Sequence, residues 1–185
     1  MATTARLALE PLAHEHAEGL VAALAGEVVG RYIGGPAVTT VEAQHERIDQ
    51  LHAGPGPDWP DEHWWNFVVR RLDDGAIIGR VEGTTYGEHH EWGEVAYLFD
   101  PAQWGRGYAT EAMAWMLSFL RGLGAADLWA AVLPTNERSI ALLARLGFDA
   151  APVPPARPLG SYDDGDLVFV SALPLGSQPP VHSAK

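Results

Sequence analysis

The chain has 185 residues, 12 of them basic and 24 acidic, a formal net charge of −12, and no cysteine. The acidity argues against nucleic acid and anionic membranes as partners, because binding to them depends on neutralising phosphates; it suits a cationic acceptor such as an amine, or simply keeps a protein soluble. The lack of cysteine excludes disulfides, thiolate zinc sites and cysteine nucleophiles. No apolar run could span a bilayer and no signal pattern opens the chain, so the expected location is cytoplasmic.

The first half of the chain reads as a strand, two helices and a series of antiparallel strands. Residues 6–12 alternate and suit a strand, and 13–29 and 40–51 have helical spacing, the second with Thr40 as N-cap. The stretch 52–62 is rich in Pro, Gly and Asp and is expected to be a loop. Strands are predicted at 66–72, 76–86 and 94–99, the first two joined by a hairpin turn at Asp73-Asp74-Gly75.

The second half alternates helices and strands. Residues 108–123 form the clearest amphipathic helix, 127–133 a strand, 136–146 a short helix, 150–158 a proline-rich loop and 166–173 a last strand. The order predicts an α+β (mixed α/β) fold in one domain over residues 1–173, with a disordered tail at 174–185.

A glycine loop between the strand 94–99 and the helix 108–123 is the clearest functional motif. Gly105 and Gly107 allow a tight turn and a close backbone approach, and the helix that follows begins with unpaired N–H groups and positive partial charge. Together with Arg106 this pattern predicts a phosphate or pyrophosphate site; the alternative is a plain strand-to-helix connection. A Walker loop is excluded because no Gly-Lys-Ser/Thr follows, and a dinucleotide fingerprint would need Gly or Ala at Thr110.

Two segments resemble signatures of the GNAT N-acetyltransferases. Residues 104–112 (Trp-Gly-Arg-Gly-Tyr-Ala-Thr-Glu-Ala) resemble the acetyl-CoA loop of that superfamily, and 136–148 resemble its second signature, with a closer likeness to the RimJ/RimL-like branch. The resemblance implies a mostly antiparallel twisted sheet with helices on both faces and a splay between two central strands. It also implies acetyl transfer from acetyl-CoA to a small-molecule amine or a protein N-terminus, and makes a homodimer plausible. The alternative is an acyl-CoA-binding module without turnover.

The resemblance assigns the cofactor-binding residues. Amides of the loop would hold the CoA pyrophosphate, the splayed strand would pair with pantetheine, and Asn136 would bind the CoA arm. The family's thiolate-protonating tyrosine is replaced by Leu143, and Ser139 is the natural substitute unless its hydroxyl faces solvent. The predicted set is Leu98, Phe99, Trp104, Gly105, Arg106, Gly107, Tyr108, Ala109, Thr110, Asn136 and Ser139.

Candidate catalytic carboxylates lie on the strands that lead to the loop. The acceptor amine must lose a proton, so Glu94 is the first candidate for the base and Glu82 the second, although either could be a solvated surface group. An N–H of residues 95–97 could stabilise the oxyanion. Aromatic residues beside the acidic loop could form the acceptor pocket or pack over the sheet: Trp59, Trp64, Trp65 and Tyr97.

No metal site is predicted. The segment Glu88-His89-His90-Glu91 holds ligand-type side chains, but adjacent turn residues rarely converge on one ion, so an exposed hairpin tip is expected. A Gly-x-Ser-x-Gly elbow is also missing, which gives serine hydrolase chemistry no support.

Overall fold

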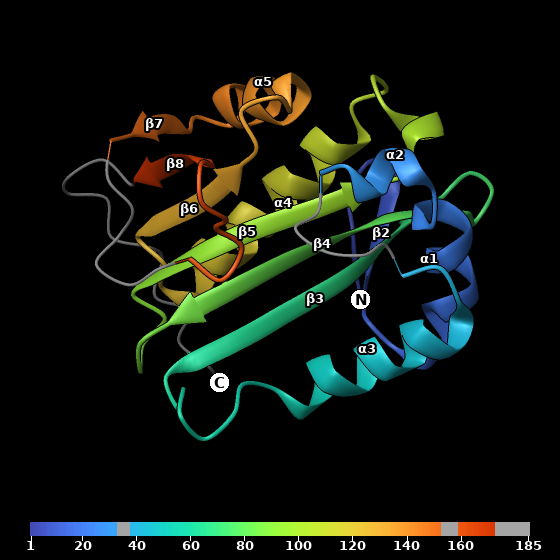
Figure 1. Cartoon of the computed structure of the whole chain (residues 1–185), viewed down its shortest axis with the longest axis horizontal. Helices are drawn as coiled ribbons and strands as arrows, with labels where there is room; N and C mark the ends of the chain where they lie inside the picture. The colour runs from blue at the N-terminus through green and yellow to red at the C-terminus, as the bar shows by residue number, and fades with distance from the viewer. Residues whose placement is uncertain (33–37, 153–158, 173–185) are drawn as a thin grey trace.

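A computed structural model describes residues 1–32, 38–152 and 159–172, whose strands form one sheet (Figure 1). The strands are β1 (Ala2–Thr3), β2 (Leu7–Pro11), β3 (Glu62–Arg71), β4 (Ile77–Tyr86), β5 (Trp92–Phe99), β6 (Asp127–Val132), β7 (Asp149–Ala151) and β8 (Leu167–Ala172). They lie in the order β1-β2-β3-β4-β5-β6-β8-β7, and every neighbouring pair is antiparallel except β5 and β6.

Helices cover both faces of this sheet. They are the short 3-10 helices η1 (His14–His16) and η2 (Pro101–Gln103), and α1 (Ala17–Leu24), α2 (Glu27–Gly30), α3 (Val41–Ala53), α4 (Tyr108–Leu123) and α5 (Glu137–Arg145). In Figure 1, α1, α2 and α3 lie on the near face and α4 lies behind the sheet. The predicted α+β fold with helices on both faces is confirmed. No helix in the described ranges is long and apolar enough to cross a membrane.

Several predicted boundaries change. The helix expected at 13–29 is divided into η1, α1 and α2, because Gly26 is extended (ψ 143°) and acts as the N-cap of α2. β3 begins at Glu62, inside the predicted loop, and β1 and β7 were not predicted because two or three residues carry too little pattern. The single domain over 1–173 stays a prediction, and the predicted tail at 174–185 lies outside the described residues.

Each face of the sheet has its own apolar core. On one face Met113, Met116 and Leu120 of α4 are fully buried, and a Cβ at Gly83 of β4 would lie 3.0 Å from Leu120. On the other face Val68 of β3 is buried with residues of α1 and α3. The missing side chain at residue 83 therefore lets α4 approach the sheet closely.

Replacing Leu120 by alanine is expected to lower the free energy of unfolding by about 2–5 kcal/mol, because it leaves a cavity in a site with no solvent exposure. Urea denaturation followed by circular dichroism measures the change. Ser118→Ala is the control on the same helix, because Ser118 is exposed and its hydroxyl bonds only the Ala114 carbonyl. A loss of under about 1 kcal/mol for Leu120→Ala would contradict the core assignment.

The parallel pair β5 and β6 separates after three residue pairs. Residues 92–94 of β5 pair with 127–129 of β6, and no pairing continues to the end of β5 at Phe99. The β5 edge that follows Glu94 therefore has backbone groups turned to a gap rather than to a strand. This is the splay that the resemblance implied.

Candidate active site

The loop between β5 and α4 is held by local hydrogen bonds. The Asp100 carboxylate accepts from the Ala102 N–H at 2.9 Å, and the Trp104 indole N–H donates to the Phe99 carbonyl at 3.0 Å. Gly107 is the N-cap of α4 with φ 80°, a left-handed conformation that favours glycine. Its position has no side-chain cap, so the first N–H groups of α4 are available for an anion.

Thr4 and Arg6 of the N-terminal segment, called the N-terminal strap below, hold this loop to the start of α4. The Glu111 carboxylate accepts hydrogen bonds from the Thr4 hydroxyl at 2.6 Å and from the Arg6 Nε at 2.7 Å. Arg6 in turn donates to the Arg106 carbonyl at 3.0 Å and lies over the Tyr108 ring. Because a trans peptide points its carbonyl and its N–H in opposite directions, this bond fixes the plane of the peptide that precedes the helix.

Replacing Glu111 by glutamine is expected to weaken CoA binding about tenfold, since it loosens Arg6 and hence the loop. Burial acts to raise the pKa of Glu111, but hydrogen bonds from Thr4 and Arg6 outweigh it and the pKa is lowered, so the carboxylate is charged at neutral pH. Isothermal titration with CoA measures the effect. Glu46→Gln removes the same charge from an exposed position on α3 and should bind CoA like the parent chain; equal affinity of all three proteins would contradict the role of the strap.

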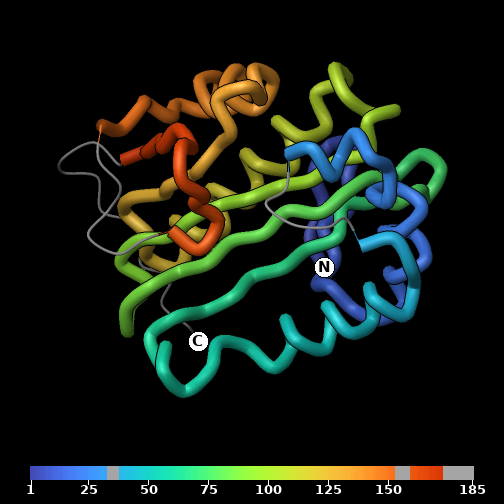
Figure 2. Tube along the Cα trace, in the orientation of Figure 1, coloured from blue at the N-terminus to red at the C-terminus, as the bar shows by residue number. Residues whose placement is uncertain are grey.

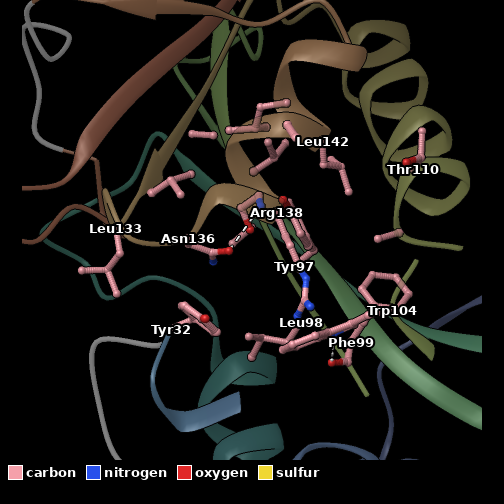
Figure 3. Close-up of a pocket in the computed structure, with 18 of the residues that line it drawn as sticks. Tyr32, Tyr97, Leu98, Phe99, Trp104, Thr110, Leu133, Asn136, Arg138 and Leu142 are labelled. Carbon is pink, nitrogen blue, oxygen red and sulfur yellow. Dashed lines mark hydrogen bonds between the residues drawn. The ribbon is translucent and has the colours of Figure 1, made fainter. Parts of the chain in front are cut away.

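A pocket of about 930 Å³ runs from this loop through the splay. Its walls include Trp104, Gly107 and Thr110 at the α4 end (Figure 3). Successive residues of β5, from Val95 to Phe99, line it from both faces of the strand. A single cavity can reach both faces of a strand only where the neighbouring strand has parted from it. The pocket therefore depends directly on the splay.

Helix α5 forms the opposite wall of this pocket. Asn136 caps the helix, its Oδ1 accepting from the Ser139 N–H at 3.2 Å, and Arg138 lies over the Trp104 ring with its Cζ 4.8 Å from the ring centroid. Figure 3 shows Tyr97, Asn136 and Arg138 around the middle of the pocket. The buried Tyr97 hydroxyl has no hydrogen-bond partner of good geometry among the described residues; burial raises the pKa of Tyr97 to about 12, and Ser139 opposes the shift.

Glu94 lies on the face of β5 that is turned toward α3. Its side chain is 8% exposed, and its Oε2 accepts from the Gly160 N–H at 2.9 Å. The segment around Gly160 crosses in front of β5 in Figure 2. Burial raises the pKa of Glu94 to about 7, against the lowering by hydrogen bonds from Gly160 and Tyr86. A carboxylate with this pKa can accept or return a proton near neutral pH.

Glu82 lies in a different electrostatic environment on the same face. Its Oε1 is 3.1 Å from the Arg80 Nε and accepts a hydrogen bond of 3.1 Å from Arg47 of α3. Burial acts to raise the pKa of Glu82, but Arg80 and Arg47 outweigh it, so the pKa is lowered. Glu82 therefore stays ionised at neutral pH and is a weaker proton acceptor than Glu94.

A second pocket of about 180 Å³ lies next to the first on this face. Glu94, Trp64 and Leu51 of α3 contribute to its walls. The two pockets share Glu82, Val95, Ala96, Gly160 and Ser161. Their meeting point lies beside the backbone of β5, where the strand has just left β6.

The structure brings together most of the predicted site residues. All of the predicted CoA-binding residues except Arg106 line the large pocket, as does Ser139. Trp64 lines the small pocket, whereas Trp59 is 52% exposed and Trp65 packs on the α4 face against Phe119; neither Trp59 nor Trp65 lines either of these two pockets. Tyr97 projects from the face of β5 opposite to Glu94, toward α5.

Residues around the site that were not predicted include Arg47, Arg80, Arg138, Gly160 and Ser161. The spacing of Arg80 and Glu82 indicates only that both lie on one face of a strand. Within the described residues, no group of three or more His, Asp or Glu side chains could hold a metal ion. The segment 88–91 forms a turn in which the His90 ring is within hydrogen-bond distance of the Thr85 hydroxyl, so it is not fully an exposed tip.

Comparisons with known proteins identify the family of this chain. The family model of the GNAT acetyltransferase domain matches residues 6–149, so the chain belongs to the GNAT acetyltransferases, a family that uses acetyl-CoA. An uncharacterized N-acetyltransferase of Bacillus subtilis, YoaA, is 26% identical over 146 residues, covering 78% of this chain and 80% of that protein.

Solved structures show the same fold. The chain resembles a GNAT-family acetyltransferase from Bacillus anthracis with a TM-score of 0.73 and 17% identity, over 92% of this chain and 96% of that one. It also resembles the ribosomal-protein-S5-alanine acetyltransferase of Vibrio fischeri, with a TM-score of 0.72 and 18% identity over 92% and 95% of the two chains. The second likeness accords with the RimJ/RimL-like resemblance of the sequence.

Proposed function

We propose that the protein transfers the acetyl group of acetyl-CoA to a primary amine that enters from the α3 face. The observation that carries this proposal is the pair of neighbouring pockets, one reaching from the α4 N-terminus to the splay and the other beside Glu94, which share five lining residues. The N–H groups of the first turn of α4 would hold the pyrophosphate, and the free edge of β5 would pair with the pantetheine arm. Asn136 and Ser139 would contact that arm from α5.

The chain's own residues divide the proton transfers. Glu94, directly or through one water, would take the proton of the ammonium so that the nitrogen lone pair can attack the thioester carbonyl. An N–H of residues 95–97 would stabilise the negative oxygen as the C–N bond forms. The C–S bond then breaks; the Ser139 hydroxyl, close to Tyr97, would give a proton to the departing thiolate and take up the second proton that the attacking nitrogen loses. The protein would bind both substrates together, with no covalent enzyme intermediate.

The acceptor class supported at this level is a small-molecule amine or a peptide N-terminus. The name of the Vibrio fischeri protein specifies an alanine of ribosomal protein S5, which makes a peptide N-terminus a reasonable probe here. The size of the small pocket, about 180 Å³, favours a small acceptor group at the reaction point. No nucleic acid, membrane or metal is part of the proposed reaction, and a homodimer and a cytoplasmic location remain expectations.

Release of free thiol from acetyl-CoA in the presence of a panel of amines and N-terminal peptides tests the proposal. Thiol release together with an acetylated amine, seen by mass spectrometry, is the expected result. Tight CoA binding without release for any acceptor would contradict it and favour an acyl-CoA-binding module instead.

A further inference from the structure

Two arginines share one carboxylate on the α3 face of the sheet, from which the acceptor amine would enter. Arg80 of β4 and Arg47 of α3 both lie within 3.1 Å of the same oxygen, Oε1 of Glu82. The Arg80 side chain is only 11% exposed, and the Arg47 and Glu82 side chains are 33% and 22% exposed. The cluster therefore holds one positive charge more than it neutralises, in a place with little access to water.

The guanidinium groups of this cluster also lack hydrogen-bond acceptors. A guanidinium has five N–H donors, and one carboxylate oxygen cannot satisfy two of these groups. The buried Nε atoms of Arg80 and Arg47 make no hydrogen bond of good geometry within the described residues, although the Glu82 carboxylate lies 3.1 Å from the Arg80 Nε as an ion-pair partner. Unsatisfied buried donors destabilise a fold, so such a pair is expected where a ligand supplies the missing acceptor.

Neighbouring acids in the described chain do not supply this acceptor. Burial lowers the pKa of Arg80, and the charged side chains that act on it are Glu82 and Arg47. Glu94, on the same face, is instead bound by the Gly160 N–H, and no arginine contributes to its pKa. Glu82 is thus the acid that acts on Arg80, and an anion supplied by a ligand would balance the second positive charge of the cluster.

Two members of the cluster line the pockets, and Arg47 adjoins them through its hydrogen bond to Glu82. Arg80 and Glu82 line the large pocket, and Glu82 also lines the small one. Glu82 is the strand partner of Ala96, whose backbone borders both cavities. Since the Arg80 Nε lies 3.1 Å from Glu82, an anion bound to this guanidinium would lie close to the shared wall of the two pockets.

We propose that Arg80 and Arg47 form a carboxylate subsite, and that the acceptor is a small amine with a carboxylate close to its nitrogen, such as a free amino acid. This inference rests on the proposed function. The ammonium would face Glu82 and Glu94 while the carboxylate accepts from the two guanidiniums, so that each end of a zwitterion meets the opposite charge. A peptide N-terminus does not fit, because its α-carboxylate is consumed in the peptide bond.

Matched acceptors test the subsite. Each of a set of amino acids is compared with its α-amide and with its decarboxylated amine in the thiol-release assay. The carboxylate member is expected to have the higher kcat/KM by at least about tenfold, and Arg80→Gln to reduce this preference to within about threefold. Arg80→Lys keeps the charge but not the planar fork and should restore the preference only in part. Equal rates for acid and amide in the parent chain would overturn the inference.

Binding measurements separate this inference from the proposed function. N-acetyl amino acids and their amides are titrated into the parent chain and into Arg80→Gln in the presence of CoA. The acid is expected to bind the parent about tenfold more tightly than the variant. If that dependence on Arg80 is seen without thiol release for any amine, the proposed function fails and the subsite stands.

Two further results would overturn the subsite. The first is CoA affinity that falls in Arg80→Gln while the acid-to-amide ratio is unchanged, since Arg80 would then serve the donor. The second is an unchanged acid-to-amide ratio in Arg47→Gln. Arg47 is more exposed than Arg80, so this variant is the one to use if Arg80→Gln lowers the melting temperature.

Discussion

Replacing Glu94 by glutamine is expected to lower kcat/KM by about 10²–10⁴-fold, because the side chain can no longer take a proton from the acceptor. Since the pKa of Glu94 is about 7, the parent activity should rise with pH through that value as the carboxylate forms, and Glu94→Gln should lose this rise. The pH dependence of kcat/KM is measured by thiol release. Glu88→Gln, an exposed change in the turn between β4 and β5, is the control.

Glu94→Gln, which is expected to lower activity, is expected to raise the stability of the fold. The pKa of Glu94 is higher in the fold than the usual 4.5, so its contribution to stability is fully present below about pH 4.5 and is lost as the pH rises through about 7. Above that pH the buried charge opposes folding by an amount on the order of 3 kcal/mol. Glu94→Gln should therefore unfold at higher urea concentration than the parent at pH 8. A variant that is both active and no more stable would remove Glu94 from the proposed role.

Replacing Gly107 by valine is expected to raise the Kd for CoA by at least about 100-fold, a loss of about 3 kcal/mol. A β-branched residue is strained at φ 80°, so the loop must shift away from the geometry that exposes its amides. Isothermal titration with CoA measures the loss.

Gly75→Val is the matched control for backbone strain. Gly75 has φ 72° in the turn between β3 and β4, with no atom within 4 Å of an added Cβ, and it lines neither pocket. It should lower stability in the same way as Gly107→Val while CoA affinity is kept. If both variants lose CoA affinity equally, the effect is one of stability and the loop assignment fails.

Local sequence pattern predicted the parts of the site whose geometry is set by neighbouring residues. The bounds of α4 follow from its apolar spacing and its terminal glycines, and the predicted cap role of Thr40 belongs to the first turn of its own helix. The two glycines of the central loop indicated a backbone that only glycine adopts easily, and both have positive φ. Such features involve residues that are close in the sequence, so the local pattern predicts them.

Contacts between distant segments were not predictable in the same way. Glu82 meets Arg47 across 35 residues, and Glu94 meets the Gly160 N–H across 66. These distances depend on how α3 and the segment before β8 pack on the sheet, which no local pattern specifies. Strand alternation places Arg80 and Glu82 on one face, but it cannot indicate that a second arginine reaches the same carboxylate. The local sequence pattern therefore predicted the residues of the proposed CoA site better than those of the proposed amine site.

The early separation of β5 from β6 has a consequence for the order of events during turnover. On the proposed function, the nucleotide-bearing substrate and the amine would each reach the centre from its own side of the splay, so neither would have to leave before the other arrives. Initial-rate plots at several fixed concentrations of one substrate should therefore give intersecting lines rather than parallel ones. A sheet whose strands β5 and β6 have separated would also let the two products leave in opposite directions.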